Sequence, residues 1–324
     1  MHLRLPGAPA RRLLALLLTA LATMAVLAAI GTAAPAQAAA PPYVALGDSY
    51  SSGTGTRAYL DDGSGCQRSA YAFPSLVAAQ KGYALNFRAC SGARIGDVRS
   101  TQLSALSSAT RYVTISVGGN DAGFADVLTE CAMPGWMSNC NAAIDGAQSY
   151  ISGTLPAALS SLYAEIRTRA PYARVVVVGY PRVFMGEDCN ALTWFSPAEQ
   201  TRLNQTADQL NSRLAAAASA RGFGFANPTA AFTGHAVCDS PEWINGLSNP
   251  VSESYHPNRA GHASGYAPLV GQQLNGAPTG VSAATVRAAL AAADRQAALQ
   301  GRYAERDAKI EQQPFRAPQV AGAR

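Results

Sequence analysis

Short runs of β-branched residues alternate with longer segments rich in alanine and leucine from residue 41 to about residue 276. This alternation is typical of βαβ units, in which helices connect the strands of a mainly parallel sheet. The run Val175–Val178 is continuously apolar, as expected for a strand that is covered on both faces. The sequence therefore predicts one three-layer α/β/α domain with a central sheet of about five strands.

The predicted strands and helices follow from these runs. Strands are predicted over Tyr43–Leu46, Tyr83–Arg88, Tyr112–Val117, Arg174–Gly179 and Phe223–Ala226. Helices are predicted over Pro156–Arg169 and Pro197–Arg221, because a proline fits the first turn of a helix and a Pro or Gly signal follows each segment. Right-handed crossover connections would place these helices on both faces of the sheet.

The first 40 residues have the composition of a secretory signal peptide. Three arginines precede the apolar run Leu13–Ile30, and small residues follow it. The stretch Ala36–Ala38 fits the small-x-small cleavage pattern, so cleavage is expected after Ala38 or Ala40. An uncleaved membrane anchor is the alternative, because the run is about as long as a short membrane span. We expect a secreted, extracellular protein with no stable membrane insertion after cleavage.

The charge of the mature chain does not indicate a nucleic-acid partner. The leader contains three of the 25 basic residues and none of the 20 acidic ones, so its removal lowers the formal net charge from +5 to +2. Binding of DNA, RNA or an anionic membrane surface would need a basic stripe or a polybasic cluster, which the sequence lacks. We expect no nucleic-acid partner and a monomeric protein.

The six cysteines are expected to form three disulfides. An even number in an exported chain favours disulfides over metal thiolates, and no CxxC pair is present. Several connectivities are possible, but pairing in sequence order closes three separate loops: Cys66–Cys90, Cys131–Cys140 and Cys189–Cys238. We favour this pairing and expect no free thiol. His235, near Cys238, has no partner at metal-ligand spacing, so neither a metal nor another cofactor is expected.

The composition changes after residue 276. Ser282–Arg302 is rich in alanine and predicts a helix, whereas the residues after it are charged and include few large apolar side chains. This composition predicts a helix packed on the outside, followed by a disordered tail. The expected organisation is a signal peptide over residues 1–40, one domain over 41–276 and a helical C-terminal extension with a disordered tail over 277–324.

Four short segments stand after predicted strands or in a late loop: Gly47–Ser51, Ala89–Ala93, Gly118–Asp121 and Glu253–Pro257. Ligands of open parallel sheets bind beyond the carboxyl ends of the strands, so these are the positions to inspect. Each segment alone has a structural explanation as a turn, a helix cap or a surface loop. Together they contribute a serine, a glycine, an asparagine and a histidine, which are the parts that acyl transfer needs.

These segments resemble the four blocks of the SGNH (GDSL-type) hydrolases, a family named for Ser, Gly, Asn and His. The matching letters are GDSY, the Gly92 segment, GGND and YHPN, spread over nearly the whole mature domain. The leader, the cysteines and the segments ACSGA and SVGGND are also similar to secreted lipases and phospholipases A1 of filamentous soil bacteria. The resemblance implies a flavodoxin-like α/β/α fold and a serine ester hydrolase. The GxSxG elbow of α/β-hydrolases is absent.

The resemblance implies a role for each of the four residues. Ser49 would attack the ester and His256 would act as its general base, since histidine titrates in the range that proton shuttling needs. The oxyanion of the intermediate would be held by the backbone N–H groups of Ser49 and Gly92 and by the side-chain amide of Asn120. Gly92 suits this role because it has no Cβ to hinder a substrate oxygen.

The chain departs from the broader family pattern at one position. The family usually has an aspartate three residues before the histidine, where this chain has Glu253. In the secreted lipases that the chain resembles, a backbone carbonyl two residues before the histidine can take the place of the aspartate, which here is that of Ser254. We therefore expect a Ser49–His256 dyad that is oriented by the Ser254 carbonyl, with Glu253 auxiliary at most.

Other polar and aromatic residues near the motifs have structural interpretations. Asp48 and Asp121 are interpreted as turn and capping groups, and His262 as a residue that helps to begin the last helix of the domain. Four aromatic residues in the loops near cysteines could form an acyl-binding surface or pack beneath the disulfide loops: Trp136, Trp194, Phe195 and Trp243.

The expected activity is that of a secreted lipase or esterase acting on a lipid or a small acyl ester. A phospholipase A1 and a carbohydrate acetyl esterase on the same fold are the alternatives among enzymes, because this fold accepts many ester substrates through loop variation. A non-catalytic secreted binding domain is the alternative from another class. An intact set of Ser49, Gly92, Asn120 and His256 favours the enzymes.

Overall fold

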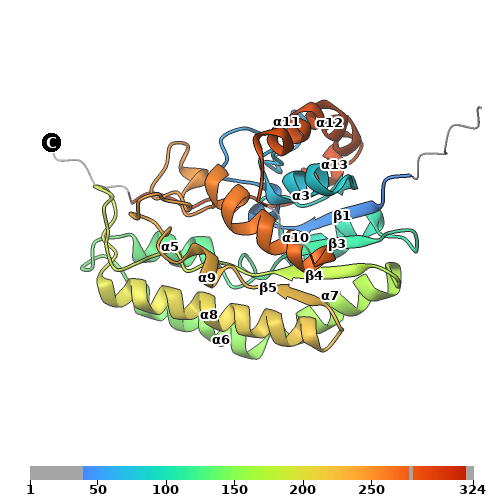
Figure 1. Cartoon of the computed structure of the whole chain (residues 1–324). Helices are drawn as coiled ribbons and strands as arrows, with labels where there is room; N and C mark the ends of the chain where they lie inside the picture. Colours follow the sequence, from blue (N-terminus) through green and yellow to red (C-terminus); the bar gives the residue numbers. More distant parts are fainter. Residues whose placement is uncertain (1–38, 277–279, 319–324) are drawn as a thin grey trace, which may run out of the picture. The chain divides into compact units, whose positions relative to one another are not determined.

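The computed structural model describes residues 39–276 and 280–318, so the predicted leader lies almost wholly outside the described residues. From Ala40 onward the described residues form one compact unit. Its five strands make a single sheet in the order β2-β1-β3-β4-β5, and every pairing is parallel (Figure 1). The strands are β1 (Pro42–Gly47), β2 (Ala84–Phe87), β3 (Tyr112–Ser116), β4 (Arg174–Val178) and β5 (Gly224–Ala226). The predicted parallel sheet is confirmed.

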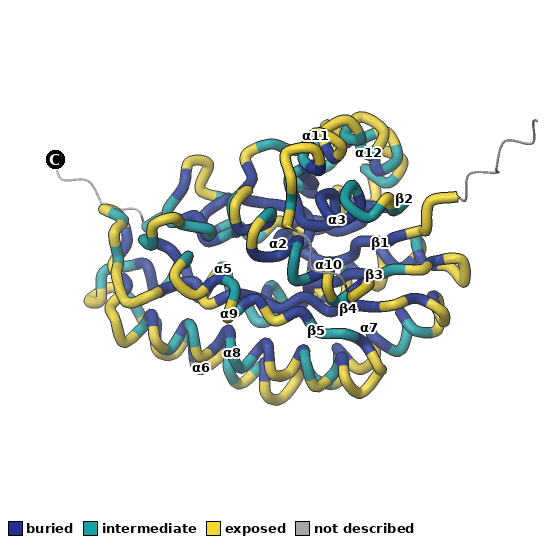
Figure 2. Tube along the Cα trace, in the orientation of Figure 1, coloured by how far each residue is buried: buried dark blue, intermediate teal, exposed yellow. Residues whose placement is uncertain are grey.

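Helices cover both faces of this sheet, which confirms the predicted three-layer architecture. Two helices pack on one face, α3 (Phe73–Lys81) and α10 (Ala267–Asn275). The other face is covered by α6 (Cys140–Gly153), α7 (Leu155–Arg169) and α8 (Pro197–Ser219) (Figure 1). Because both faces are covered, Val175–Val178 of β4 are all buried, as Figure 2 shows for the central strands. In the described ranges, no helix is long and apolar enough to cross a bilayer.

The start of α8 illustrates how the sequence sets a helix boundary. Ser196 accepts a hydrogen bond from the Glu199 N–H, and the Glu199 carboxylate accepts one from the Ser196 N–H. This capping box satisfies N–H groups that have no partner inside the helix, and Pro197 fits the first helical position. The predicted helix over residues 197–221 is therefore present with nearly the same bounds.

Three disulfides join the same cysteines that pairing in sequence order joins. They are Cys66–Cys90, Cys131–Cys140 and Cys189–Cys238, and all six cysteines belong to the described residues. The second one ties the end of α5 (Phe124–Cys131) to the start of α6. Each bridge closes a loop and so reduces the conformational freedom of the unfolded chain.

The C-terminal extension differs from the prediction of one helix and a disordered tail. The alanine-rich stretch forms two helices, α11 (Ala283–Ala291) and α12 (Ala293–Gly301), which pack against α3 and β2, and α13 (Ala304–Asp307) follows. Over residues 303–318 the predicted tail is instead packed, because Asp307, Ile310 and Phe315 are almost completely buried. Residues 319–324 lie outside the described residues. The average composition of the tail did not predict this packing, because it depends on a few buried side chains.

A buried cluster of charges fixes the extension to the domain. Asp307 lies between two arginines of the domain, with its carboxylate oxygens 2.5 Å from Arg68 Nη2 and 2.6 Å from Arg88 Nη2. Arg68 Nη1 is also 2.6 Å from the Asp62 carboxylate. All four side chains are almost fully buried, so each arginine depends on its acidic partners to offset the loss of hydration. The domain and the extension therefore stabilise each other through Asp307.

Candidate active site

Ser49 lies where the chain leaves β1 and enters a short helix. Gly47, the last residue of β1, has a φ of +121°, and a Cβ there would lie 2.3 Å from the carbonyl oxygen of Ser116 on β3. Only glycine allows this close approach of the two strands. Asp48 then caps α2 (Ser49–Ser52) by accepting a hydrogen bond from a backbone N–H of its first turn. Ser49 is thereby fixed at the carboxyl edge of the sheet.

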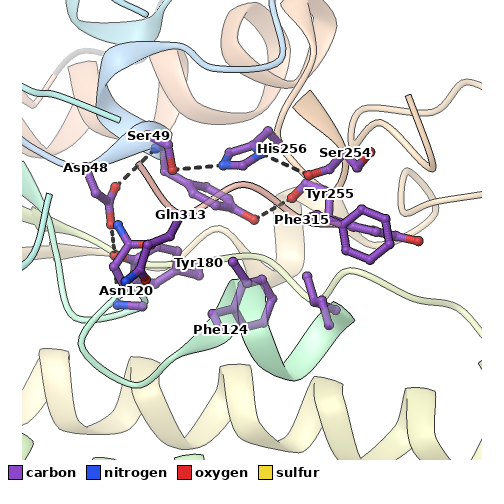
Figure 3. Close-up of a pocket in the computed structure, with 14 residues that line it drawn as sticks. Asp48, Ser49, Asn120, Phe124, Tyr180, Ser254, Tyr255, His256, Gln313 and Phe315 are labelled. Atoms are coloured by element: carbon purple, nitrogen blue, oxygen red, sulfur yellow. Dashed lines mark hydrogen bonds between the residues drawn. The ribbon is translucent and has the colours of Figure 1, made fainter. Parts of the chain in front are cut away.

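The side chain of His256 meets that of Ser49, although 207 positions separate the two residues in the sequence (Figure 3). His256 Nε2 is 2.8 Å from Ser49 Oγ, and Nδ1 is 2.9 Å from the carbonyl oxygen of Ser254. A carbonyl oxygen can only accept a hydrogen bond, so Nδ1 carries the proton and Nε2 presents its lone pair to the serine hydroxyl. An imidazole in this tautomer can take the hydroxyl proton.

Burial keeps this imidazole neutral. It lowers the pKa of His256 to about 4, because a protonated ring would lose hydration among the surrounding side chains, and the hydrogen bond to Ser254 opposes this shift only in part. The ring of Tyr50 lies 5.3 Å from the imidazole, centroid to centroid. At neutral pH His256 is therefore in the form that can accept a proton.

Glu253 directs its carboxylate away from the imidazole. Its Oε1 accepts a hydrogen bond of 2.5 Å from the Tyr59 hydroxyl, and its Oε2 lies 3.4 Å from Arg57 Nε. The Glu253 side chain is only 2% exposed, and its Oε2 has the nearby Arg57 charge but no hydrogen-bond partner among the described residues. Among the described residues, the hydrogen-bond partner of His256 Nδ1 is the Ser254 carbonyl.

The loop that carries His256 is bonded to the helix that carries Ser49. The Tyr50 hydroxyl donates a hydrogen bond of 2.8 Å to the carbonyl oxygen of Tyr255. Asn245 secures the loop from the other side, because its N–H donates to the His256 carbonyl and its carbonyl accepts from the Tyr255 N–H, both at 2.9 Å. The sequence did not predict these contacts, because nothing near Tyr50 in the sequence points to the Tyr255 carbonyl, 205 positions away.

Gly92 and Asn120 share a cavity of about 280 Å³ with Ser49 and His256, so the fold brings all four motif residues together. The Asn120 amide donates one hydrogen bond of 3.1 Å to the Ala93 carbonyl, which holds the side chain in place and leaves a second N–H. Within residues 39–276 and 280–318, no acceptor is bonded to the backbone N–H of Ser49 or Gly92. Each of these three residues of the cavity wall thus has an N–H group without an acceptor among the described residues.

Tyr180 is a polar residue of the site that sequence reasoning missed. Its hydroxyl donates to the Asp48 carboxylate and accepts a hydrogen bond of 3.4 Å from the Gly119 N–H. Asp48 also accepts a bond of 2.6 Å from the Ser116 hydroxyl, yet burial raises its pKa to about 6 because desolvation outweighs these hydrogen bonds. Tyr180 thereby connects the Ser49 turn to the segment that carries Asn120.

Several apolar side chains line a second cavity that also includes Ser49. They include Phe124, Leu128, Tyr255 and Phe315, as Figure 3 shows for the three aromatic residues. The four aromatic residues that the sequence raised as acyl-binding candidates lie elsewhere, with Trp136 exposed and Phe195 packed beneath Tyr255. The described residues contain no cluster of His, Cys, Asp and Glu side chains that could hold a metal ion.

A serine hydroxyl bonded to a neutral imidazole, beside free N–H donors at the carboxyl edge of a parallel sheet, is the arrangement of a serine hydrolase. The family model described as the GDSL-like Lipase/Acylhydrolase family matches residues 45–264. The chain belongs to this family, and it is a carboxylic ester hydrolase.

Similar proteins come from streptomycetes. Lipase 1 of Streptomyces coelicolor is 46% identical over 257 residues, which cover 77% of this chain and 93% of that protein. The crystal structure of an extracellular lipase from Streptomyces rimosus matches with a TM-score of 0.69 at 43% identity, over 72% of this chain and all of that one. The crystal structure of phospholipase A1 from Streptomyces albidoflavus matches with the same TM-score at 40% identity, with the same coverage.

Proposed function

We propose that the protein is a secreted lipase or esterase in which Ser49 is the nucleophile and His256 the general base. The observation that carries this proposal is the hydrogen bond of 2.8 Å between His256 Nε2 and Ser49 Oγ. A serine hydroxyl is a weak nucleophile until a neighbouring base takes its proton. Secretion is supported by the leader sequence, by the three disulfides and by the extracellular relative from Streptomyces rimosus.

In the first half of the reaction, Ser49 Oγ bonds to the ester carbonyl carbon while its proton moves to His256 Nε2. The carbonyl electrons move onto oxygen, and the N–H groups of Ser49, Gly92 and Asn120 donate to this oxyanion. The carbonyl then re-forms, the bond to the alkoxy oxygen breaks, and the imidazolium protonates the leaving alcohol. An acyl group remains on Ser49. The Ser254 carbonyl holds Nδ1–H throughout, which stabilises the ring in the reactive orientation.

In the second half, water takes the place of the alcohol. His256 removes a proton from water as the water oxygen attacks the acyl carbon, and the same donors hold the second oxyanion. The bond to Ser49 Oγ breaks, the serine recovers its proton from the imidazolium, and the carboxylic acid leaves.

Active-site labelling tests the proposal directly. The purified protein is incubated with a p-nitrophenyl alkylphosphonate, and release of p-nitrophenol and the mass of the intact protein are measured. We expect one adduct per molecule, located on the peptide that contains Ser49, and no adduct in Ser49→Ala. The matched control is Ser52→Ala, three residues away in the same short helix, which should label like the unchanged protein. Labelling that persists in Ser49→Ala would refute the assignment.

Replacing Asn120 with alanine removes one oxyanion donor. We expect kcat for p-nitrophenyl butyrate to fall by about 10²–10³-fold, because loss of one such donor costs ~2.7–4 kcal/mol of transition-state stabilisation. Asn275→Ala, a surface asparagine at the end of α10, serves as the control. Steady-state kinetics separate this effect from weaker binding, since KM should change little. A loss confined to KM would show that Asn120 only positions the substrate.

The pH dependence of kcat/KM should reflect the lowered pKa of His256. The neutral imidazole is the active form, so activity is expected to persist as the pH falls through 6.5 and to be lost only near pH 4. Asp48 is another titratable side chain near this site, and its pKa is raised to about 6. The profile is therefore measured in Asp48→Asn as well. An acidic limb near pH 6.5 in both proteins would mean that burial does not depress the histidine.

Glu253→Gln should have a small effect. The Glu253 carboxylate is bonded to Tyr59 and Arg57 rather than to the imidazole, so we expect kcat to fall by less than about tenfold, against the ~10⁴-fold of a lost triad aspartate. Glutamine keeps the size of the side chain and an acceptor for Tyr59. A loss near 10⁴-fold with an unchanged melting temperature would assign Glu253 to the catalytic machinery.

Phospholipase A1 activity is the second candidate. It is favoured by the match to the Streptomyces albidoflavus enzyme, which is as good in TM-score as the match to the lipase. Hydrolysis of phosphatidylcholine in mixed micelles is compared with that of triacylglycerol and p-nitrophenyl esters, with Ser49→Ala as the blank. Release of the sn-1 acyl chain from phosphatidylcholine would show phospholipase A1 activity.

A further inference from the structure

The C-terminal extension runs through the cleft around Ser49. Its residues 311–315, here called the cleft segment, pack directly on the Gly92 turn. The Glu311 carbonyl oxygen lies 2.3 Å from the position that a Cβ on Gly92 would occupy, and Gln312 Nε2 donates a hydrogen bond of 2.9 Å to the Ser91 carbonyl. Only the missing side chain of Gly92 allows this contact. The segment therefore touches one of the three proposed oxyanion donors.

Gln313 lies in the walls of two cavities. The Phe124 cavity, which has both apolar and polar walls, and the Gly92 cavity both contain Ser49, Asn120, His256 and Gln313 in their walls. Figure 3 shows Gln313 beside Ser49 and Asn120. The Phe124 cavity measures about 30 Å³ and the Gly92 cavity about 280 Å³. The first has room for one or two water molecules, whereas sites for larger ligands measure ~300–1,000 Å³.

The cleft segment is held at both ends. Upstream, Asp307 is bonded to Arg68 and Arg88 in the buried charge cluster. Downstream, Phe315 is 2% exposed and packs edge to face on Tyr255 at 4.8 Å between ring centroids. Between these anchors the fit is poorer, because the buried Oε1 of Gln313 has no hydrogen-bond partner among the described residues. An unsatisfied buried oxygen destabilises this closed arrangement.

The cleft segment lies outside the part of the chain that the family model matches, because the model ends at residue 264. The solved lipase and phospholipase are each matched over their full length by 72% of this chain.

We propose that the cleft segment determines the size of substrate that the intact protein accepts. This inference rests on the proposed function. Small soluble esters reach Ser49 through the Gly92 cavity, and their carbonyl oxygen meets the donors there. Long acyl chains need the apolar Phe124 cavity, which Gln313 and Phe315 fill. Displacement of the segment joins the two cavities and admits long-chain esters.

Two full-length variants test this proposal, Phe315→Ala and one in which residues 311–315 are replaced by Gly-Ser-Gly-Ser-Gly. Both keep Asp307 and its ion pairs. The value of kcat/KM is measured for p-nitrophenyl butyrate and p-nitrophenyl palmitate in the same detergent micelles. We expect the palmitate value to rise by about tenfold or more, since burial of a phenylalanine is strong enough to shift an equilibrium by that factor. Butyrate hydrolysis should change much less. Lys309→Ala, an exposed side chain before the segment, is the control.

The outcomes separate this proposal from the proposed function. The proposal would be overturned if the ratio of kcat/KM for palmitate to that for butyrate stays the same or falls in both variants. The segment would then have no effect on long-chain esters, or it would help to bind them. Phosphonate labelling of Ser49 and the melting temperature are measured in every variant to exclude loss of folding. If the unchanged protein and all variants fail to label, the proposed function fails instead.

Discussion

Ser49→Ala, His256→Ala and the double variant are expected to lose the same factor in kcat, about 10⁶-fold, because the two residues act as one unit. Without the hydroxyl there is no acyl intermediate, and without the imidazole the hydroxyl keeps its proton. The second substitution removes a function that the first has already abolished. The residual rate is expected to come from the proposed oxyanion donors, because the N–H groups of residue 49, Gly92 and Asn120 remain in all three variants.

The three variants are compared under single-turnover conditions with p-nitrophenyl butyrate, after removal of any contaminating esterase. Melting temperatures are recorded in parallel, because Ser49 and His256 contribute little apolar burial and folding should be retained. Effects that multiply, so that the double variant is far slower than either single variant, would mean that the two residues act independently. That result would disprove the dyad.

Asp307→Ala should lower the free energy of unfolding by about 3–5 kcal/mol, the cost of leaving buried charges without a partner. Both Arg68 and Arg88 lose an acidic partner in this variant, and Arg88 has no other carboxylate among the ion pairs of the described residues. Both guanidinium groups would then stay buried with fewer acidic partners to offset their loss of hydration.

Urea denaturation followed by tryptophan fluorescence measures this change. The control is Glu305→Ala, which removes an exposed carboxylate from the same short helix and should change the unfolding free energy by no more than about 0.5 kcal/mol. Equal midpoints for the two variants would mean that the cluster contributes nothing to stability. An Asp307 variant that unfolds in two steps would instead show that the extension detaches before the domain unfolds.

The sequence predicted the sheet well because each buried strand is marked by its own residues. A run such as Val175–Val178 has few structural alternatives once prolines and glycines limit its length. The motif residues Ser49 and His256 could be predicted for a different reason, since a reaction of known chemistry needs those groups together. The five strands and the family could therefore be predicted from the sequence alone.

The contacts that complete the site were not accessible, because they join residues that only the fold brings together. Tyr180 is one of 13 tyrosines, and nothing near it in the sequence points to Asp48, 132 positions away. The packing of the cleft segment could not be predicted from the sequence for a related reason. Average composition describes a whole tail, whereas this one is held by a few buried side chains, which include the carboxylate of Asp307 and the aromatic ring of Phe315.

The distance along the chain between Ser49 and its imidazole partner has a consequence for biosynthesis. A ribosome delivers β1 and its serine early, and the histidine emerges 207 residues later. Under the proposed mechanism, an unfinished chain contains the Ser49 hydroxyl without the imidazole that activates it. Hydrolytic activity would then arise only when the last part of the domain has been translated and has docked, which would protect the lipids of the cell that makes the protein.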